Sequence, residues 1–502
     1  MLPVHVTHRE YQDRLRASIV GLAAESPNLR KDVEASADVI GLCYAMDLDR
    51  AAPILRANYA RGGPLAIDPA VMLRAILIMC YRMIPGFTAL VDELKRSSVL
   101  RVVIGCEEPP GPSTFYDFLG RLPGFRAMAR RTVKRRIRKR RPKRKYPKGK
   151  KPPLRRANAM QFLEHLRYAE LIPEAEELVK TMNYLLDKGF VSLSLERGLI
   201  GDPLGLAAAG DSSSVELHAS PYGKRTPECD CPPATGLSCP HRRRYSAPDA
   251  DWNWESSKAE WVFGYRFYEF TAARGEELPL CIGMPTKPQQ NDAISGYVCL
   301  LQYHRLVGRP LRMVLFDSAH DNEPTYRLVR DLGAIPVIDL NSGNTGSGED
   351  QPKPIKSTAQ IGLGGIDARG TPHCAAGPMC WQGHTGGYQR FVCPAPHKGL
   401  HCPHAASCPR RSVHLKPEMS PRFICEIPRA TQAWEKTYDR RTTVERSHDR
   451  KKNDFGREAG YSRARHVVYA LYVLAGCLQH IIAWAKRING QALLAAWLPQ
   501  AA

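Results

Sequence analysis

The sequence predicts an α/β protein with a mixed sheet flanked by helices, a helical N-terminal domain and a Cys/His-rich insertion. Three observations predict it. Within residues 201–344, short apolar runs that meet an Asp alternate with helical stretches. Residues 1–125 carry apolar side chains at helical spacing, and residues 345–430 are rich in cysteine and histidine. With 502 residues, 43% of them hydrophobic, the chain can bury a core, and its length suggests two to four domains.

Short helices are predicted for the N-terminal domain. Asp68 followed by Pro69 is a favourable helix start, so we expect a helix over residues 69–81, with further amphipathic helices over 86–94 and 114–122. Short helices joined by tight turns suit a DNA-reading helix-turn-helix. A plain helical bundle explains the pattern equally well.

A basic linker is predicted over residues 126–156. Residues 130–156 hold 17 Lys or Arg and no acidic residue, and like-charge repulsion and prolines favour an extended chain. The whole protein has a formal net charge of +22 and a pI near 9.5, which indicates a nucleic-acid partner. The linker is expected to order on DNA; a nuclear localisation signal or a solvated tether are the alternatives. Residues 157–200 are expected to form a helical connector.

Two aspartates follow strand-like runs. Residues 204–210 are apolar and lead to Asp211, which is expected at or just past the end of a strand, with Gly210 allowing close approach of backbone or ligand. Residues 313–316 form a buried-strand candidate that Asp317 ends, and a further run over 334–340 follows one helix later. An Asp after a strand more commonly caps a turn.

Two more strands are expected between these aspartates, over residues 261–273 and 278–284. Alternating aromatic residues in the first of them are typical of a partly exposed strand.

Near the C-terminus, Tyr438, Arg441, Glu445 and Lys452 have the spacing Y-x2-R-x3-E-x6-K. On one continuous α-helix these offsets place all four side chains in one stripe. Glu445 could then bind a cation while Arg441 and Lys452 hold phosphate. The alternative is a solvated charged helix.

Together with the two upstream aspartates, this spacing resembles the insertion-sequence transposases of the DDE class, which carry a Tyr-Arg-Glu-Lys signature. The resemblance implies a ribonuclease H-like catalytic domain over residues 201–344 and 431–490, interrupted by the insertion subdomain at 345–430. It also implies cleavage at transposon ends, strand transfer into target DNA, double-stranded terminal inverted repeats as substrate, and a homodimer on paired ends.

Three carboxylates suit this chemistry. Asp211, Asp317 and Glu445 would bind two Mg2+ or Mn2+ ions, which activate the attacking oxygen and stabilise the leaving oxygen at phosphorus. Arg441 and Lys452 would neutralise phosphate charge. Tyr438 would donate a hydrogen bond to phosphate, or simply pack.

Two alternatives lack strand transfer. One is a zinc-containing DNA-binding regulator derived from an inactive transposase. The other is a two-metal nuclease.

Zinc is the second metal that the sequence suggests. Cys229, Cys231, Cys239 and His241 form a compact set with soft-ligand spacing, and free thiols or a redox-labile pair are the alternatives. A second set lies in the insertion, where Cys393, Cys402 and Cys408 stand in Cys-Pro turns. Its neighbours are Cys374, Cys380, His373, His384, His397, His401 and His404. The remaining cysteines are expected in apolar surroundings.

Residues 466–485 are nearly uncharged, and we expect a buried helix against the sheet rather than a membrane span. Since no signal peptide is recognised, the protein is expected in the cytoplasm, at the nucleoid if bacterial. The Gly/Ser-rich residues 341–349 lack a Gly-Lys-Ser/Thr and predict a hinge, not an ATP-binding loop.

Overall fold

The computed structural model describes residues 2–60, 62–129, 163, 175–239, 241, 243–255, 259–284, 291–341, 365–367, 371–408, 411–458 and 462–498. Residues 130–156 of the basic linker and 342–349 of the Gly/Ser-rich stretch lie outside the described residues. Helix α9, Phe125–Ala129, covers the first residues of the predicted linker.

Nine helices form the N-terminal region in the part described, residues 2–129. They are α1 (His8–Glu25), α2 (Pro27–Ala35), α3 (Ala37–Ala45), α4 (Ala51–Arg56), α5 (Pro69–Tyr81), α6 (Phe87–Arg96), α7 (Ser98–Ile104), α8 (Pro112–Gly120) and α9. Helix α5 begins where predicted, because the Asp68 side chain accepts a hydrogen bond from the Ala70 amide and Pro69 needs no donor there. The predicted helical N-terminal region is confirmed.

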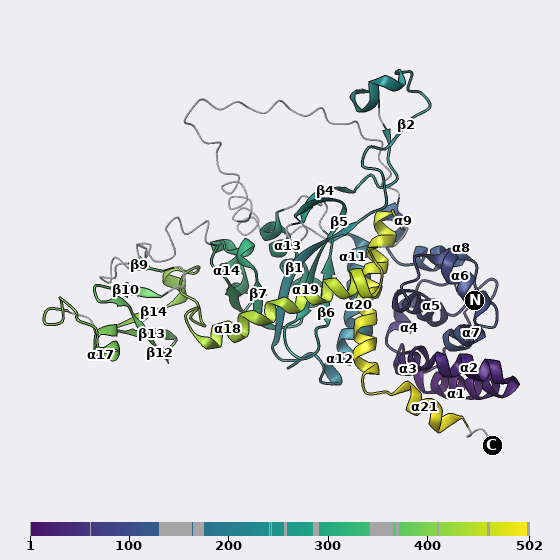
Figure 1. Cartoon of the computed structure of the whole chain (residues 1–502), viewed down its shortest axis with the longest axis horizontal. Helices are drawn as coiled ribbons and strands as arrows, with labels where there is room; N and C mark the ends of the chain where they lie inside the picture. The colour runs from purple at the N-terminus through teal and green to yellow at the C-terminus, as the bar shows by residue number, and fades with distance from the viewer. Residues whose placement is uncertain are drawn as a thin grey trace.

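A mixed sheet forms the centre of the molecule (Figure 1). Its strand order is β4-β5-β1-β7-β8, and β6 also pairs with β5. The strands are β1 (Leu206–Glu216), β4 (Asp251–Glu255), β5 (Glu260–Ala272), β6 (Pro279–Gly283), β7 (Leu311–Phe316) and β8 (Ile335–Ile338). Strand β1 runs antiparallel to β5 and parallel to β7, and β7 runs parallel to β8. The predicted mixed sheet flanked by helices is therefore confirmed; β4 was not expected.

Helices cover both faces of this sheet. One face packs on α13 (Asp292–Leu306), where a Cβ on Gly296 would lie 2.5 Å from the Tyr268 hydroxyl. The other face packs on α19 (Thr442–Asp449), whose Val444 shares a buried cluster with Ala209 and Leu315. Further helical elements are α11 (Glu177–Leu186), the π turn η1 (Asp187–Val191), α12 (Ser192–Glu196), α14 (Glu323–Asp331), α18 (Gln432–Tyr438) and α21 (Gly490–Trp497).

Helix α20, Arg465–Ala485, joins the sheet to the N-terminal helices. Its Tyr472 ring stacks on Phe267 of β5 with centroids 4.0 Å apart. The helix has the length and hydropathy of a membrane span, but 94% of its most apolar window is buried inside the protein. It is the predicted buried helix, and it belongs to one large buried cluster that also includes residues of the N-terminal helices and of the sheet.

Two strand predictions are wrong in detail. Strand β5 is buried over most of its length rather than partly exposed, because it pairs on both edges and is covered on both faces. Asp211 lies in the middle of β1 rather than at its end, because the serines after it continue the pairing with β5. Gly210 leaves room for neighbouring rings and not for a ligand, since a Cβ there would lie 2.6 Å from Phe316 and 2.7 Å from Phe270.

The insertion has its own small core, in the described residues 365–367, 371–408 and 411–430. Two three-stranded sheets, β11-β10-β9 and β12-β13-β14, surround buried residues such as Phe391 and Val413. The elements are β9 (Gly365–Ile366), β10 (Pro372–Cys374), β11 (Gly377–Pro378), β12 (Cys380–Thr385), β13 (Tyr388–Val392), α17 (Pro394–Lys398), β14 (Ser412–Leu415) and η4 (Pro417–Met419). Buried Arg429 ties it to the sheet through the Ile338 carbonyl at 2.8 Å.

A projecting segment separates β1 from β4 (Figure 1). It contains the two-residue strands β2 (Lys224–Arg225) and β3 (Arg243–Arg244) and the 3-10 turn η2 (Pro233–Ser238). We call residues 221–245 the arm.

Candidate active site and metal-ligating groups

The sheet aligns the two aspartates that the sequence singles out. Strands β1 and β7 are parallel, and Ala209 pairs with Leu315. Asp211 and Asp317 each lie two residues further along, so they stand level on neighbouring strands and on the same face. Ala209 and Leu315 on that face pack against Val444 of α19. The two carboxylates thus lie on the same face of the sheet as these apolar side chains, at the end of the strands beside α19.

Helix α19 brings Glu445 to the same edge. Val444 anchors the helix in the core, and Glu445 beside it is exposed. One turn later, the buried His448 lies with Nε2 3.3 Å from the Asp211 carbonyl and Nδ1 2.7 Å from the Tyr472 hydroxyl. A carbonyl only accepts, so Nε2 carries the proton. Burial lowers the pKa of His448 to about 4, which keeps this link neutral.

The two aspartates influence each other electrostatically. Burial raises the pKa of Asp211 to about 7, and the charge of Asp317 adds to the rise. Burial also pushes the pKa of Asp317 upward, but a hydrogen bond and the charge from His320 outweigh it, so the pKa lies below its usual value. Neighbouring carboxylates with opposite shifts are typical of sites that bind cations or move protons.

His320 fixes the orientation of Asp317. Its Nδ1 lies 2.6 Å from Asp317 Oδ1, and its Nε2 lies 2.9 Å from the Tyr268 hydroxyl. The ring is fully buried and stacks on Phe316 with centroids 4.5 Å apart. Asp317 Oδ1 also accepts from the Ala319 amide, which is the turn-capping role of an Asp after a strand. Sequence reasoning missed His320, although its place three residues after Asp317 was a usable signal.

Each of the three carboxylates keeps one oxygen without a hydrogen-bond partner among the described residues. Oδ1 of Asp211 accepts from the Ser212 amide at 2.7 Å, and Oε1 of Glu445 accepts from Arg441 Nη1 at 2.7 Å. In Asp317, Oδ1 contacts both the Ala319 amide and His320 Nδ1. Three carboxylates with an open oxygen each suit a hard divalent cation. Their ligand atoms are not all within 4.8 Å of one another.

Arg441 joins this site from the 3-10 turn η5, Asp439–Arg441. Besides its bond to Glu445, its charge lowers the pKa of Asp317. Its Nε is buried and has no hydrogen-bond partner among the described residues. The guanidinium therefore retains a donor for an anion at the carboxylate edge.

Tyr438 packs. Its ring stacks on Trp434 with centroids 4.5 Å apart and an interplanar angle of 12°, and it lies against the cluster under α19. Burial raises its pKa to about 12. The stacked and partly buried ring fits the packing alternative for Tyr438.

The expected single α-helical stripe over residues 438–452 is wrong. A 3-10 turn, η5, precedes α19, and a π turn, η6 (Arg450–Asp454), follows it. Because a π turn spaces its hydrogen bonds five residues apart, the α-helical offset no longer holds at Lys452. Lys452 is half-buried there, and the adjacent Lys451 points inward.

Lys451 and Glu269 form a fully buried ion pair that sequence reasoning missed. Lys451 Nζ lies 2.9 and 2.8 Å from the two Glu269 oxygens, and Ser447 Oγ donates to Glu269 at 2.6 Å. Gln479 of α20 donates to the Ser447 carbonyl at 2.8 Å. This network fastens α19 to β5 and α20, and so holds Glu445 and Arg441 in place. The sequence signal for this buried pair was the position of Glu269 among the apolar residues of β5.

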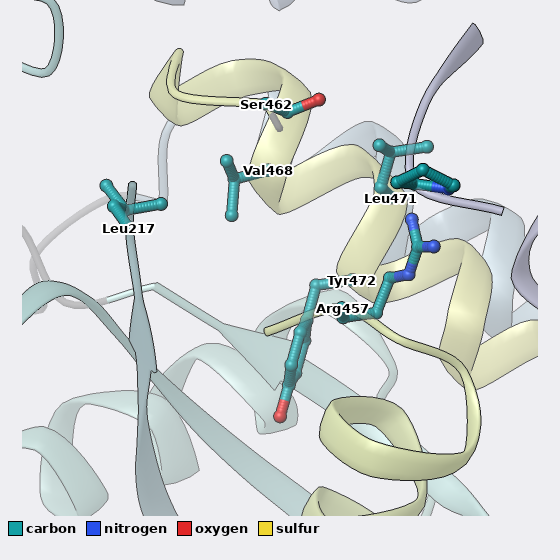
Figure 2. Close-up of a pocket in the computed structure, with 7 residues that line it drawn as sticks. Leu217, Arg457, Ser462, Val468, Leu471 and Tyr472 are labelled. Atoms are coloured by element: carbon teal, nitrogen blue, oxygen red, sulfur yellow. The ribbon is translucent and has the colours of Figure 1, made fainter. Parts of the chain in front are cut away.

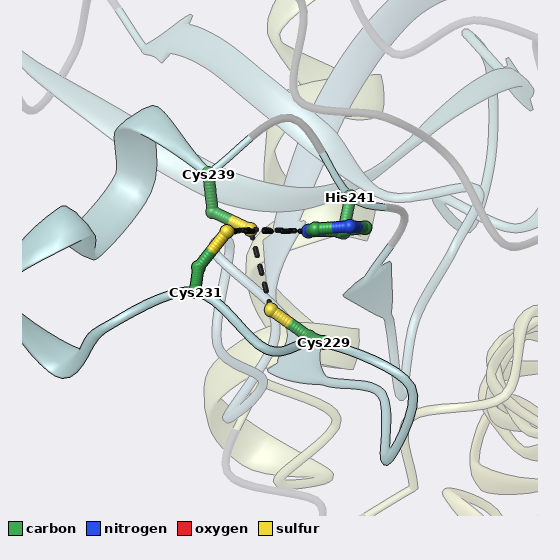
Figure 3. A group of neighbouring side chains, drawn as sticks. All are labelled: Cys229, Cys231, Cys239 and His241. Atoms are coloured by element: carbon green, nitrogen blue, oxygen red, sulfur yellow. Dashed lines mark hydrogen bonds between the residues drawn. The ribbon is translucent and has the colours of Figure 1, made fainter.

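The four predicted zinc ligands come together on the arm (Figure 3). Their ligand atoms all lie within 4.8 Å of one another, which among the described residues holds for no other group of three or more His, Cys, Asp or Glu. The Cys229–Cys239 and Cys239–Cys231 sulfur distances are 3.4 and 3.5 Å. His241 Nδ1 lies 3.3 Å from Cys231 Sγ and 3.4 Å from Cys239 Sγ.

The second predicted zinc set is not assembled. Cys393, Cys402 and Cys408 do not form a group within 4.8 Å in the structure that residues 371–408 adopt. Burial raises the pKa of the Cys374 thiol, and Cys393 and Cys402 raise it further, so these three cysteines are neighbours.

Two hollows lie near these elements. Figure 2 shows a small pocket between α20 and Leu217, the residue after β1. Arg457, which lines it, donates to the Phe455 carbonyl at 2.8 Å. It is mostly apolar, and we assign it no ligand. An open groove follows the start of α19 and is lined by Ala273, Arg274, Gly275, Glu277, Asp439, Arg440, Thr442, Thr443 and Arg446.

Comparison with known proteins gives one family match. Residues 28–121, which span most of α2 through α8, match a family described as Transposase domain (DUF772). No curated protein matches the chain. The match is confined to the N-terminal helices, and it supports a transposase-family protein with a transposase-like function.

Proposed function

We propose that the protein is a DDE-class DNA transposase, which cleaves DNA at transposon ends with divalent metal ions and joins the freed 3′ hydroxyl to target DNA. The observation that carries the proposal is the alignment of Asp211 and Asp317 on neighbouring parallel strands, under a helix that presents Glu445. The transposase-domain match supports it from a separate part of the chain.

The sheet supports a ribonuclease H-like catalytic domain. Three antiparallel strands, β6, β5 and β1, continue into the parallel strands β7 and β8; Asp211 lies on the third strand of this series, and Asp317 directly follows the fourth. Carboxylates at the same edge of such a sheet can hold two Mg2+ or Mn2+ ions for in-line displacement at phosphorus.

Arg441 is the residue that we assign to phosphate binding. Its buried Nε lacks a partner among the described residues, and its Nη1 is already held by Glu445. A guanidinium fixed in this way would contact the scissile phosphate with little loss of side-chain freedom. The groove with Arg274, Arg440 and Arg446 beside α19 is a suitable path for the DNA backbone. Lys452 is retained as a further phosphate contact, and Tyr438 as support for Arg441.

Cleavage of the element's own ends tests the proposal. The full chain is incubated with Mg2+ and a labelled duplex that carries the sequence flanking the coding region, and nicked and joined products are separated. We expect wild-type protein to give both products, and Asp211→Asn, Asp317→Asn or Glu445→Gln to lower the rate by about 10³-fold or more.

The matched control is Asp202→Asn, an exposed Asp in the turn before β1 whose carboxylate accepts a hydrogen bond from the Leu204 amide. It should cleave as wild type does. Binding of the same duplex should persist in all four variants. Wild-type cleavage by any one of the three active-site variants would overturn the assignment. Nicking without joined products would favour a two-metal nuclease, and binding without either product would favour a DNA-binding regulator.

A further inference from the structure

We propose that Cys229, Cys231, Cys239 and His241 bind one structural Zn2+ ion, and that this ion holds the arm in its observed conformation. The four side chains (Figure 3) lie on the arm, which projects between β1 and β4 and away from α19 (Figure 1). It would therefore serve architecture and not phosphoryl transfer.

The distances match a tetrahedral metal site better than a disulfide. Zn–S bonds of about 2.3 Å and Zn–N bonds of about 2.0 Å give ligand–ligand edges of roughly 3.5–3.8 Å in a tetrahedron. The sulfur–sulfur and sulfur–nitrogen distances here are 3.3–3.5 Å. A disulfide needs about 2.05 Å between two sulfurs and leaves no role for a third thiol and an imidazole. Three thiolates and one imidazole complete a closed set of soft ligands.

The arm has almost no hydrophobic core of its own. Among the residues of 221–245 whose burial is described, only Cys239, Arg243 and Tyr245 are buried. Its two strands are two residues long each. Segments of this size usually need a disulfide or a metal ion to stay folded, since apolar burial cannot offset the entropy of ordering the chain.

Polar contacts shape the ligand loop around the proposed ion. Arg225 donates to the carbonyls of Cys231, Pro232 and Pro233 at 2.7, 3.1 and 3.2 Å. Arg243, which pairs with Arg225 across the two strands, donates to the Gly236 carbonyl at 2.5 Å. These bonds hold the backbone on both sides of the cysteines.

His241 is oriented as a metal ligand would be. Its Nδ1 faces the sulfurs, and its Nε2 lies 3.7 Å from Oδ1 of Asp230. A carboxylate near the second ring nitrogen commonly fixes the ring of a metal-bound histidine. Asp230 stands between Cys229 and Cys231 in the chain, so the same loop supplies two ligands and this partner.

Zinc content of the purified full chain tests the site. Protein made without added chelator is measured by elemental analysis, and Cys239→Ser and His241→Ala are compared with wild type. We expect each variant to lose one zinc per chain relative to wild type. Cys106→Ser, a half-buried cysteine of the N-terminal region, is the matched control and should lose none. His241→Cys should retain the ion, because a thiolate can replace the imidazole as a ligand. This result would distinguish loss of a ligand from misfolding as the cause of zinc loss in His241→Ala.

A second readout locates the ion. The wild-type protein loaded with Co2+ should show the visible bands of a tetrahedral thiolate site, and Cys239→Ser should remove them or lower their intensity. Equal zinc content and equal Co2+ spectra in wild type and Cys239→Ser would overturn the proposal. So would a Cys229–Cys239 or Cys231–Cys239 disulfide in peptides prepared without reductant. DNA cleavage is not used, so failure here is distinct from failure of the proposed function.

Discussion

The carboxylate edge and the arm are both proposed metal sites, but the fold supports them in different ways. Asp211 and Asp317 stand on central strands, and the helix with Glu445 is fastened by a buried ion pair, Lys451–Glu269. The arm has three buried residues among those described and brings the four proposed zinc ligands together. The catalytic geometry would thus exist before its ions bind, whereas the arm would take its order from the ion. Four perturbations separate these two cases.

The largest effect is expected from Lys451→Met. Removing one partner of a buried ion pair leaves Glu269 charged and unpaired, which typically costs about 3–5 kcal/mol of unfolding free energy. Denaturant titration measures it. Lys452→Met, one residue further on and half-buried, should change stability by about 0.5 kcal/mol or less. Equal losses of unfolding free energy in the two variants would contradict the conclusion that the Lys451–Glu269 pair fastens α19 to the sheet.

Acid should weaken the core through His480, the next largest effect. This buried ring contacts Ser194 Oγ at 2.8 Å and the Pro279 carbonyl at 2.9 Å. Burial lowers its pKa to about 4 from 6.5, so the unfolded chain takes up a proton first as the pH falls. Stability is then full above pH 6.5 and falls toward pH 4, by about 3 kcal/mol in all.

Stability measured from pH 7 to 4 tests this. His480→Gln should flatten the slope, whereas the exposed His401→Gln should leave it unchanged. A slope that His480→Gln does not alter would assign the acid sensitivity to other groups.

Chelation should act on the arm and spare the sheet. We expect a zinc chelator to open protease sites within residues 221–245 and to leave the main thermal unfolding midpoint within about 2 °C, because the arm shares little of the core. Mass spectrometry of early fragments shows where cutting occurs. Early cutting within β5 or α20 instead would show that the ion supports the core and would remove the contrast between the two sites.

The smallest effect is expected from the outer face of the arm. Lys224 and Arg244 are paired across β2 and β3 and are both exposed. Like charges placed opposite each other repel, and a phosphate would relieve that repulsion. Lys224→Ala and Arg244→Ala should each lower DNA affinity about two- to fivefold and reduce its salt dependence by about one charge. The control is Glu255→Ala, at the last residue of β4, which should not lower DNA affinity. Unchanged DNA affinity in both arm variants would contradict a DNA contact by the arm.

Much of the fold could be predicted because apolar runs are local signals. Three elements are predicted by the residues within them alone. They are β7, from the apolar run before Asp317; α5, from its capped start; and α20, from its long apolar sequence. The end of β1 could not be predicted, since the pairing with β5 carries the strand through three serines. Small polar residues usually mark the end of a strand, but pairing with a neighbouring strand can extend the strand through them.

The candidate site was predictable by residue type but not by contact. The resemblance to DDE-class transposases groups Asp211, Asp317 and Glu445, and soft-ligand spacing predicts that the arm cysteines come together, as they do in the structure. Lys451, which lies in the π turn, pairs with Glu269, 182 residues away in the chain. His320 and Tyr268 likewise meet only in the folded protein. Such tertiary contacts leave no periodic trace in the sequence.

Backbone cleavage directed by Fe2+ tests the central claim most directly. Fe2+ can occupy oxygen-rich sites suited to Mg2+, and with peroxide and ascorbate it cuts the chain near its ligands. In zinc-loaded full-length protein we predict cuts clustered near Asp211, Asp317 and Glu445, suppressed by excess Mg2+ and lost in Asp211→Asn. Cuts absent from these three positions, or unchanged in Asp211→Asn, would contradict a metal site at the carboxylate edge.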